Sequence, residues 1–270
     1  MLRNYKITSI HFSDDNTFRD DSEALELCDL VESVTNGKGI PWRCATRIDT
    51  LSCLSNFTYT KLAASGCKGI VAGIESGVDR VLQLMGKNTS VLQIQKAFKA
   101  MSENGLHRNL FSFLFGFTGE TEKEAKKTLI LARKTRMMFP DSDITLHVYF
   151  PGASDADWLA PDIPTALASR QSEIFANYYA SHITNYWLGR IHIRVLRYYF
   201  GASKRKENNP TGWKGFLRSI YQRLIFMRIK YGIFALPFEY YLSNSFIKNI
   251  KKCLYSVRSK TAKFIRLKKI

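Results

Sequence analysis

The sequence has 270 residues and a formal net charge of +17, from 40 Lys and Arg against 23 Asp and Glu. This length suffices for one large domain or for a domain with an appendage. No run of about 18 uncharged apolar residues occurs, so a membrane-spanning helix is not expected. The start, MLRNYKITSIHFSDD, lacks the apolar core of a secretory signal.

The charge is unevenly distributed along the chain. Residues 189–270 hold 20 Lys and Arg but two acids, Glu207 and Glu239, whereas the first 188 residues are close to neutral. Such asymmetry predicts a second half that is attracted to an anionic surface. The five cysteines have no metal-ligand spacing, and their odd number predicts free thiols in a reducing, cytoplasmic setting.

Residues 5–152 alternate short apolar runs with longer amphipathic ones, which predicts strands alternating with helices. The predicted strands are Lys6–Phe12, Pro41–Thr46, Lys68–Ile74, Asn109–Phe115 and Ile144–Phe150. The predicted helices are Asp20–Thr35, Thr58–Ser65, Val78–Met85, Val91–Asn104 and Thr121–Met138. This alternation predicts an α/β fold with a parallel sheet, and both an open doubly wound sheet and a β/α barrel fit it.

The pattern changes after residue 150. Pro151–Pro164 has three prolines and three aspartates and is predicted to be a long loop, followed by a helix over Thr165–Leu188. Lys204–Gly215 is expected to be a polar linker, and basic, aromatic-rich helices follow. We therefore expect a barrel over 1–152, a loop and helical extension over 153–203, and a basic amphipathic tail over 204–270.

Polar and charged residues follow the predicted strands in succession. They are Asp14 and Asp15, Arg47 and Asp49, Glu75 with Ser76 and Gly77, the turn from Gly116 to Thr121, and Tyr149 with Phe150. Each alone is open to a capping or turn interpretation. In a parallel sheet, however, all of them meet at one edge, where ligands bind. His11 and His147 lie within predicted strands and are expected to be core residues rather than ligands.

These residues carry a resemblance to a known family. The succession IHFSDDNTF, WRCATRID, KLAASGCKGIVAGIESGVDRVLQLMGK, FSFLFGFTGET and VYFPG resembles the second to sixth strands of the radical S-adenosylmethionine (SAM) superfamily. It is most similar to the branch that often carries a B12-binding domain. The resemblance implies a partial β/α, TIM-like barrel, a 4Fe–4S cluster that binds SAM, and radical chemistry; cobalamin is a further expected cofactor.

The resemblance also implies roles for individual residues. Asp14 and Asp15 match a position that contacts the SAM amino group, and Arg47 matches an arginine that pairs with the SAM carboxylate. Glu75 matches a carboxylate that accepts hydrogen bonds from the ribose or the amino group. The remaining expected SAM contacts are Gly73, Ser76, Gly77, Gly116, Gly119, Tyr149 and Phe150. No catalytic residue and no metal ligand is assigned.

One part of the family pattern is missing from the sequence. The C-x-x-x-C-x-x-C motif that holds the cluster is absent, and Cys44, Cys53 and Cys67 do not form a single compact loop that could replace it. We therefore expect an N-terminally truncated fragment, inactive alone, with a separate chain as one source of the cluster loop.

The expected function is SAM-dependent radical chemistry on a small or lipidic substrate. The alternative is a non-catalytic remnant or subunit that binds a partner or an anionic membrane surface through residues 213–270, where Lys and Arg alternate with aromatic and aliphatic residues. Because no nucleic-acid motif is present, nucleic acid is not an expected partner. A cytoplasmic protein, peripheral at the membrane, is expected.

Overall fold

The structure is a computed structural model that describes residues 7–117, 119–149, 193–204 and 212–234. The chain divides into two units, 1–233 and 234–270, and apart from Phe234 the described residues all belong to the first. Phe150, the predicted helix over Thr165–Leu188 and most of the basic tail lie outside the described residues.

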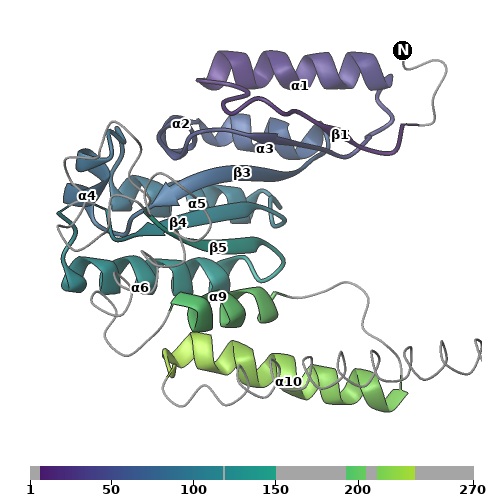
Figure 1. The fold of residues 1–270 in the computed structure, drawn as a ribbon. Coiled ribbons are helices and arrows are strands. Elements are labelled where there is room, and N and C mark those ends of the chain that lie inside the picture. Colours follow the sequence, from purple (N-terminus) through teal and green to yellow (C-terminus); the bar gives the residue numbers. More distant parts are fainter. Residues whose placement is uncertain (1–6, 118, 150–192, 205–211, 235–270) are drawn as a thin grey trace, which may run out of the picture. The chain divides into compact units, whose positions relative to one another are not determined.

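Strands and helices alternate along the first unit (Figure 1). The strands are β1 (Ile10–His11), β2 (Trp42–Ala45), β3 (Cys67–Glu75), β4 (Leu110–Phe115) and β5 (Asp143–Val148). The helices are α1 (Asp21–Thr35), α2 (Ile48–Cys53), α3 (Asn56–Ala64), α4 (Asp79–Leu84), α5 (Val91–Glu103), α6 (Glu122–Met138), α9 (Ile193–Ala202) and α10 (Gly212–Tyr231).

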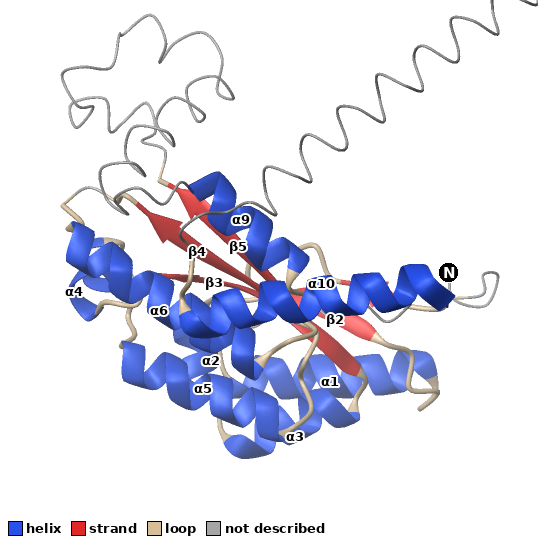
Figure 2. Ribbon diagram, turned by 90° about the horizontal axis from the view of Figure 1, so that it is seen from below, coloured by secondary structure: helices blue, strands red, loops and turns tan. Residues whose placement is uncertain are grey.

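The five strands form one parallel sheet in the order β1-β2-β3-β4-β5. In this order every strand pairs with the one before it, so the strand order never reverses. A doubly wound sheet needs such a reversal to place helices on both faces. Right-handed crossovers between sequential neighbours instead place the helices on one face, as in a barrel. Figure 2 shows α1, α3 and α5 together on one side of the sheet. The predicted partial β/α barrel is confirmed.

The two faces of the sheet differ in chemistry. The helix-covered face carries Phe111, Phe113 and Phe115 of β4, all fully buried. Phe111 packs against Phe98 of α5 and against Phe139, with ring centroids 4.8 and 5.2 Å apart. The opposite face carries polar side chains that are partly or fully exposed, together with the apolar Leu110 and Leu114 of β4. The polar ones, for which we call it the polar face, are Arg43, Ser112, Thr145 and His147. A parallel sheet is usually covered by apolar contacts on both faces, so the polar face is the one suited to a ligand.

Helix α9 lies along the free edge of β5. The N–H groups of Asp143 and Tyr149 donate to the carbonyls of Asn109 and Phe115, on the β4 side of the strand. Successive backbone groups of a strand alternate in direction, and Leu146 is three residues from both, so its carbonyl points away from β4. The Arg197 side chain of α9 donates to the Leu146 carbonyl, and Lys204 pairs with Asp143 at 2.6 Å. This edge of the sheet is therefore capped.

The edge at β1 is different. Beside the two-residue strand β1 lies an apolar groove of about 490 Å³ between the strand and α1. Its lining includes Ile10, Phe12, Val31 and Val34. Among the described elements, none pairs with β1 on this side.

Three sequence predictions need correction. Strand β1 covers two residues instead of the predicted Lys6–Phe12. Helix α2 was not predicted, because Ile48–Cys53 is short and no side chain caps its first turn. Helix α10 begins at Gly212, inside the predicted linker. In the described part of the chain, no helix combines the length and apolarity needed to cross a membrane.

Candidate functional site at the carboxyl edge of the sheet

The carboxyl ends of the five strands lie at one edge of the sheet, because all the strands are parallel. Five segments leave the strands there: residues 12–20, Thr46 with Arg47, Glu75, residues 116–121 and Tyr149. Parallel α/β sheets place their ligands at this edge. The described residues among those singled out in the sequence therefore lie at or near this edge, and their roles as SAM contacts stay predictions.

Glu75 has an unusual backbone at the end of β3. Its φ is 63°, a left-handed conformation that costs a residue other than glycine about 1 kcal/mol or more. The pairing with β4 shifts here, from Gly73 opposite Ser112 to Glu75 opposite Phe113. Such bulges redirect a side chain and are common beside functional sites.

Gly73 makes room for the redirected carboxylate. A Cβ atom added at Gly73 would lie 2.1 Å from Oε1 of Glu75 and 3.6 Å from Oγ of Ser112. The Glu75 carboxylate thus folds back over Gly73 on the polar face, near Ser112. The sequence predicted that Gly73 brings the backbone close to a ligand; in the structure the group close to it is Glu75.

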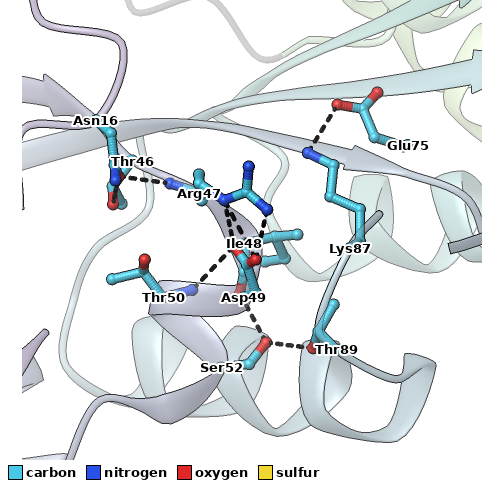
Figure 3. Close-up of polar contacts among 10 residues, drawn as sticks. All are labelled: Asn16, Thr46, Arg47, Ile48, Asp49, Thr50, Ser52, Glu75, Lys87 and Thr89. Atoms are coloured by element: carbon cyan, nitrogen blue, oxygen red, sulfur yellow. Dashed lines mark hydrogen bonds and ion pairs between the residues drawn. The ribbon is translucent and has the colours of Figure 1, made fainter. Parts of the chain in front are cut away.

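Lys87 is the ion-pair partner of Glu75, and sequence reasoning missed it. Its Nζ lies 3.4 Å from Oε1 of Glu75, and the side chains are 16% and 21% exposed (Figure 3). Thr89, two residues on, donates to Oγ of Ser52 in α2 at 3.0 Å, which fixes the segment. The pair is long for an ion pair, and one Glu75 oxygen has no partner among the contacts found in the described residues.

His147 belongs to the same polar face. It is exposed, and so is His11, which corrects the prediction that both are core residues. Partial burial of its ring lowers the pKa of His147, and the nearby charge of Arg197 lowers it further, while Glu75 acts in the opposite direction. Glu75 and His147 are thus close enough to interact electrostatically across β4.

Arg47 follows β2 and already has a partner. Its Nη2 donates to Oδ2 of Asp49 at 2.7 Å, and its Nε to Oδ1 at 3.0 Å (Figure 3). Burial raises the pKa of Asp49, but the hydrogen bonds and charge of Arg47, together with backbone hydrogen bonds from Asp49 and Thr50, outweigh it, so the pKa of Asp49 is lowered. The guanidinium is still 45% exposed, so it can receive an anion while keeping Asp49.

The loop after β1 packs against the end of β2. The Thr46 hydroxyl donates to Oδ1 of Asn16 at 2.9 Å, and the Arg47 N–H donates to the same oxygen at 3.3 Å. Asp14 and Asp15, in this loop, are exposed. The capping alternative, which the sequence leaves open for Asp14, Asp15 and Asp20, is confirmed at Asp20, whose side chain accepts from Glu23 N–H at the start of α1.

Ser76 and Gly77 contact α6 rather than open space. The Ser76 hydroxyl is buried and lies 3.2 Å from the Thr128 hydroxyl, which accepts from Gly77 N–H at 3.0 Å. A Cβ at Gly77 would come within 2.9 Å of the Lys127 carbonyl oxygen. Both residues have a packing role here, and their contact with SAM stays a prediction.

The turn after β4 contains a buried carboxyl group that the sequence interpretation treated as turn chemistry. Glu120 is fully buried; its Oε2 accepts from Gly116 N–H at 2.6 Å, and its Oε1 has no hydrogen-bond partner among the described residues. Burial raises the pKa of Glu120 to about 7. Arg80 of α4 braces the same turn by donating to the Gly119 carbonyl at 2.7 Å. The predicted capping chemistry is also present, because Thr121 and Glu124 form a capping box.

An aromatic surface stands at the end of β5. The rings of Tyr149 and Phe117 meet edge to face, with centroids 4.7 Å apart. The face of an aromatic ring suits an adenine ring, and the adenine contact expected of Tyr149 stays a prediction.

The described residues do not fit an iron–sulfur cluster. They contain no group of three His, Cys, Asp or Glu side chains able to hold a metal ion. Cys28, Cys44 and Cys67 are buried in the core. Burial raises the pKa of the Cys28 thiol, and a hydrogen bond with Cys67, together with burial, raises that of Cys44. Cluster ligands must be thiolates, so these cysteines favour packing over ligation.

No family model matches the chain. Among curated proteins it is 28% identical to an uncharacterized methyltransferase of Pyrococcus horikoshii, over 55% of this chain and 30% of that protein. It is 33% identical to a tRNA-2-methylthio-N(6)-dimethylallyladenosine synthase of Pseudomonas paraeruginosa, over 37% of this chain and 22% of that protein. The matched part thus spans less than a third of the length of these relatives.

Three similar solved structures are OxsB, TsrM and HemN. OxsB, a cobalamin-dependent SAM radical enzyme, is 19% identical with a TM-score of 0.41, covering 47% of this chain and 19% of its own. TsrM of Kitasatospora setae, a radical SAM methyltransferase bound to cobalamin and a [4Fe-4S] cluster, is 15% identical with a TM-score of 0.43, covering 53% and 26%.

HemN of Escherichia coli, a coproporphyrinogen III oxidase, is 13% identical with a TM-score of 0.44, covering 66% of this chain and 40% of its own. These three solved structures are radical SAM enzymes.

Proposed function

We propose that this chain binds SAM at the carboxyl edge of its sheet and takes part in radical SAM chemistry. The observation that carries the proposal is Glu75: a carboxylate held in a strained backbone conformation, over a glycine and beside Lys87. Strain of this kind persists where the surrounding structure imposes it, and it occurs preferentially at ligand sites.

Each side chain would then have a defined contact. Glu75 would accept hydrogen bonds from the ribose hydroxyls with the oxygen that Lys87 leaves free. The exposed Arg47 guanidinium would pair with the carboxylate of the amino-acid part, and Tyr149 would lie against the adenine. SAM, when bound, supplies an activated methyl or adenosyl group for transfer. Asp14 and Asp15 would receive its amino group.

Cluster chemistry is not assigned to the described residues, because they lack a ligand set. Under this proposal the cluster comes from elsewhere, for instance a separate chain, and these residues hold the nucleoside and amino-acid parts of SAM. Cobalamin, present in OxsB and TsrM, and a small or lipidic substrate belong to the same proposal.

The test is isothermal titration of SAM into the full chain under anaerobic conditions. Glu75→Gln and Arg47→Met should each weaken SAM binding by about tenfold or more, since each removes a charged hydrogen-bonding partner. The matched controls are Glu103→Gln and Lys96→Met, both exposed on α5, which should bind as the wild type does. Absence of SAM binding by the wild type, or equal binding by all variants, would remove the proposal.

A second candidate function is favoured by the charge of the C-terminal part. We propose that residues 213–270 attach a cytoplasmic protein to an anionic membrane surface, with or without catalysis by the sheet. The support is 20 basic residues against two acids over 189–270. Sedimentation with phosphatidylglycerol vesicles should show binding that weakens as salt rises; binding that salt leaves unchanged would contradict an electrostatic attachment.

A further inference from the structure

Helix α10 exposes a continuous row of large apolar side chains. We name this set the apolar stripe; it consists of Trp213, Phe216, Leu217, Ile220, Leu224, Met227 and Tyr231. At 3.6 residues per turn these positions fall within an arc of about 100°, so they share one side of the helix over its whole length. Trp213 is 70% exposed, Phe216 57% and Met227 53%.

The opposite side of α10 is fixed to the rest of the unit. Ile225 and Ile229 are fully buried. Arg133 of α6 donates through Nε to the Ile229 carbonyl and through Nη2 to the Lys230 carbonyl, both at 2.6 Å. The Arg228 guanidinium lies 5.6 Å from the ring centre of Tyr199 in α9. The stripe is therefore presented to the outside by a helix whose other side is already used.

The charges beside the stripe are all positive. Arg223 and Lys230 are exposed and lie about 70° to 90° from its centre, on the same flank. Arg218, which is partly exposed, lies about 150° from the centre, on the side of Ile225 and Ile229. The sequence contains no acidic residue between 208 and 238. An apolar face with basic residues along one flank matches an anionic lipid surface, where apolar side chains enter the acyl boundary and Lys and Arg meet the headgroups.

We infer that α10 is the docking face for an anionic membrane surface, and that it lies in the plane of the lipid headgroups with the apolar stripe turned into the bilayer. This inference rests on the second proposed function and makes it specific. Binding depends on burial of the stripe as well as on the charge of residues 213–270. It is independent of whether the chain binds SAM.

The experiment compares sedimentation of the full chain with phosphatidylcholine vesicles that do or do not contain phosphatidylglycerol. The stripe variant is Phe216→Ser, Ile220→Ser and Leu224→Ser combined. Its control is Leu30→Ser, Phe57→Ser and Leu92→Ser combined, three apolar residues of similar exposure on α1, α3 and α5. The stripe variant should lose about a hundredfold in partitioning into anionic vesicles, and the control none.

The remaining outcomes are distinct. A charge variant, Arg223→Gln and Lys230→Gln combined, should bind more weakly and with less dependence on salt. If the stripe variant binds like the wild type, basic charge alone attaches the protein; the inference falls and the second proposed function stands. If the wild type binds neither vesicle, both fall. If the wild type is a dimer, the stripe variant is a monomer, and neither protein binds vesicles, then the stripe joins two copies of the chain and the inference is wrong.

Discussion

The substitution Gly73→Ala should separate ligand binding from stability. The added Cβ would lie 2.1 Å from Oε1 and 3.1 Å from Cδ of Glu75, whereas ordinary contacts are about 3.5 Å. The nearest atoms belong to the end of a flexible side chain. The carboxylate can therefore swing away while the strands stay in place.

The magnitudes follow from these contacts. Alanine in a strand gains about 0.5 to 1 kcal/mol over glycine, and the partly exposed pair of Glu75 with Lys87 is worth about 0 to 1 kcal/mol. The free energy of unfolding should then change by less than about 1 kcal/mol. Loss of charged hydrogen bonds from a displaced carboxylate, at about 1.5 to 3 kcal/mol, should weaken SAM binding by about tenfold to a hundredfold.

Gly69→Ala is the matched comparison on the same strand. Its Cβ would lie 2.0 Å from the backbone carbonyl oxygen of Arg108, which cannot move without shifting the chain before β4. Its free energy of unfolding should fall by about 3 kcal/mol. Urea denaturation followed by circular dichroism, with SAM calorimetry, measures both quantities. The reasoning is refuted if Gly73→Ala unfolds as easily as Gly69→Ala, or if it binds SAM normally.

Three further predictions concern the body of the fold. Because the pKa of Glu120 is raised from 4.5 to about 7, the folded protein keeps a proton that the unfolded chain releases between these two pH values. The free energy of unfolding should therefore fall by up to about 3 kcal/mol as pH rises through this window. In urea denaturation at several pH values, Glu120→Gln should remove this part of the pH dependence. Arg136→Met removes donors to the carbonyls of Ser142 (2.7 Å) and Phe200 (3.0 Å) and should lower the free energy of unfolding by about 3 kcal/mol, whereas the exposed Lys134→Met should be neutral. Alkylation followed by peptide mass spectrometry should modify Cys53 in the native protein, while Cys28, Cys44 and Cys67 react only after unfolding; fast reaction at Cys44 would contradict its burial.

The sequence predicts the fold well where the signal is local. The five strands and the helices between them follow from apolar runs bracketed by turn residues, and the capping box at Thr121 follows from its Thr and Glu spacing. The barrel order could not be chosen over a doubly wound sheet, because strand order depends on how crossovers pack and not on any one segment. Helix α2 was missed because six residues without a side-chain cap carry little periodicity.

The candidate site shows the same limit. That Glu75 lies at the edge of the sheet is readable from its position after an apolar run. Its positive φ is not, because it arises from a register shift against β4, about 40 residues later in the chain. Lys87 has no local signature either: only the fold brings it beside Glu75. Glu120 is buried because its turn folds back on Gly116, so its altered acidity could not be inferred from GFTGET alone.

The two edges of the sheet differ in how readily another strand could be added to them. At β5, Arg197 donates a hydrogen bond to the outward carbonyl of Leu146, so an additional strand would first have to displace helix α9. At β1, in the part of the chain described, one side of the backbone is unpaired, and the apolar groove of about 490 Å³ lies next to it. Among the described residues, no contact would have to break for another strand with its helix to pair there. Enlargement of this architecture, whether by gene fusion or by a companion polypeptide, is easier before the first strand than after the last.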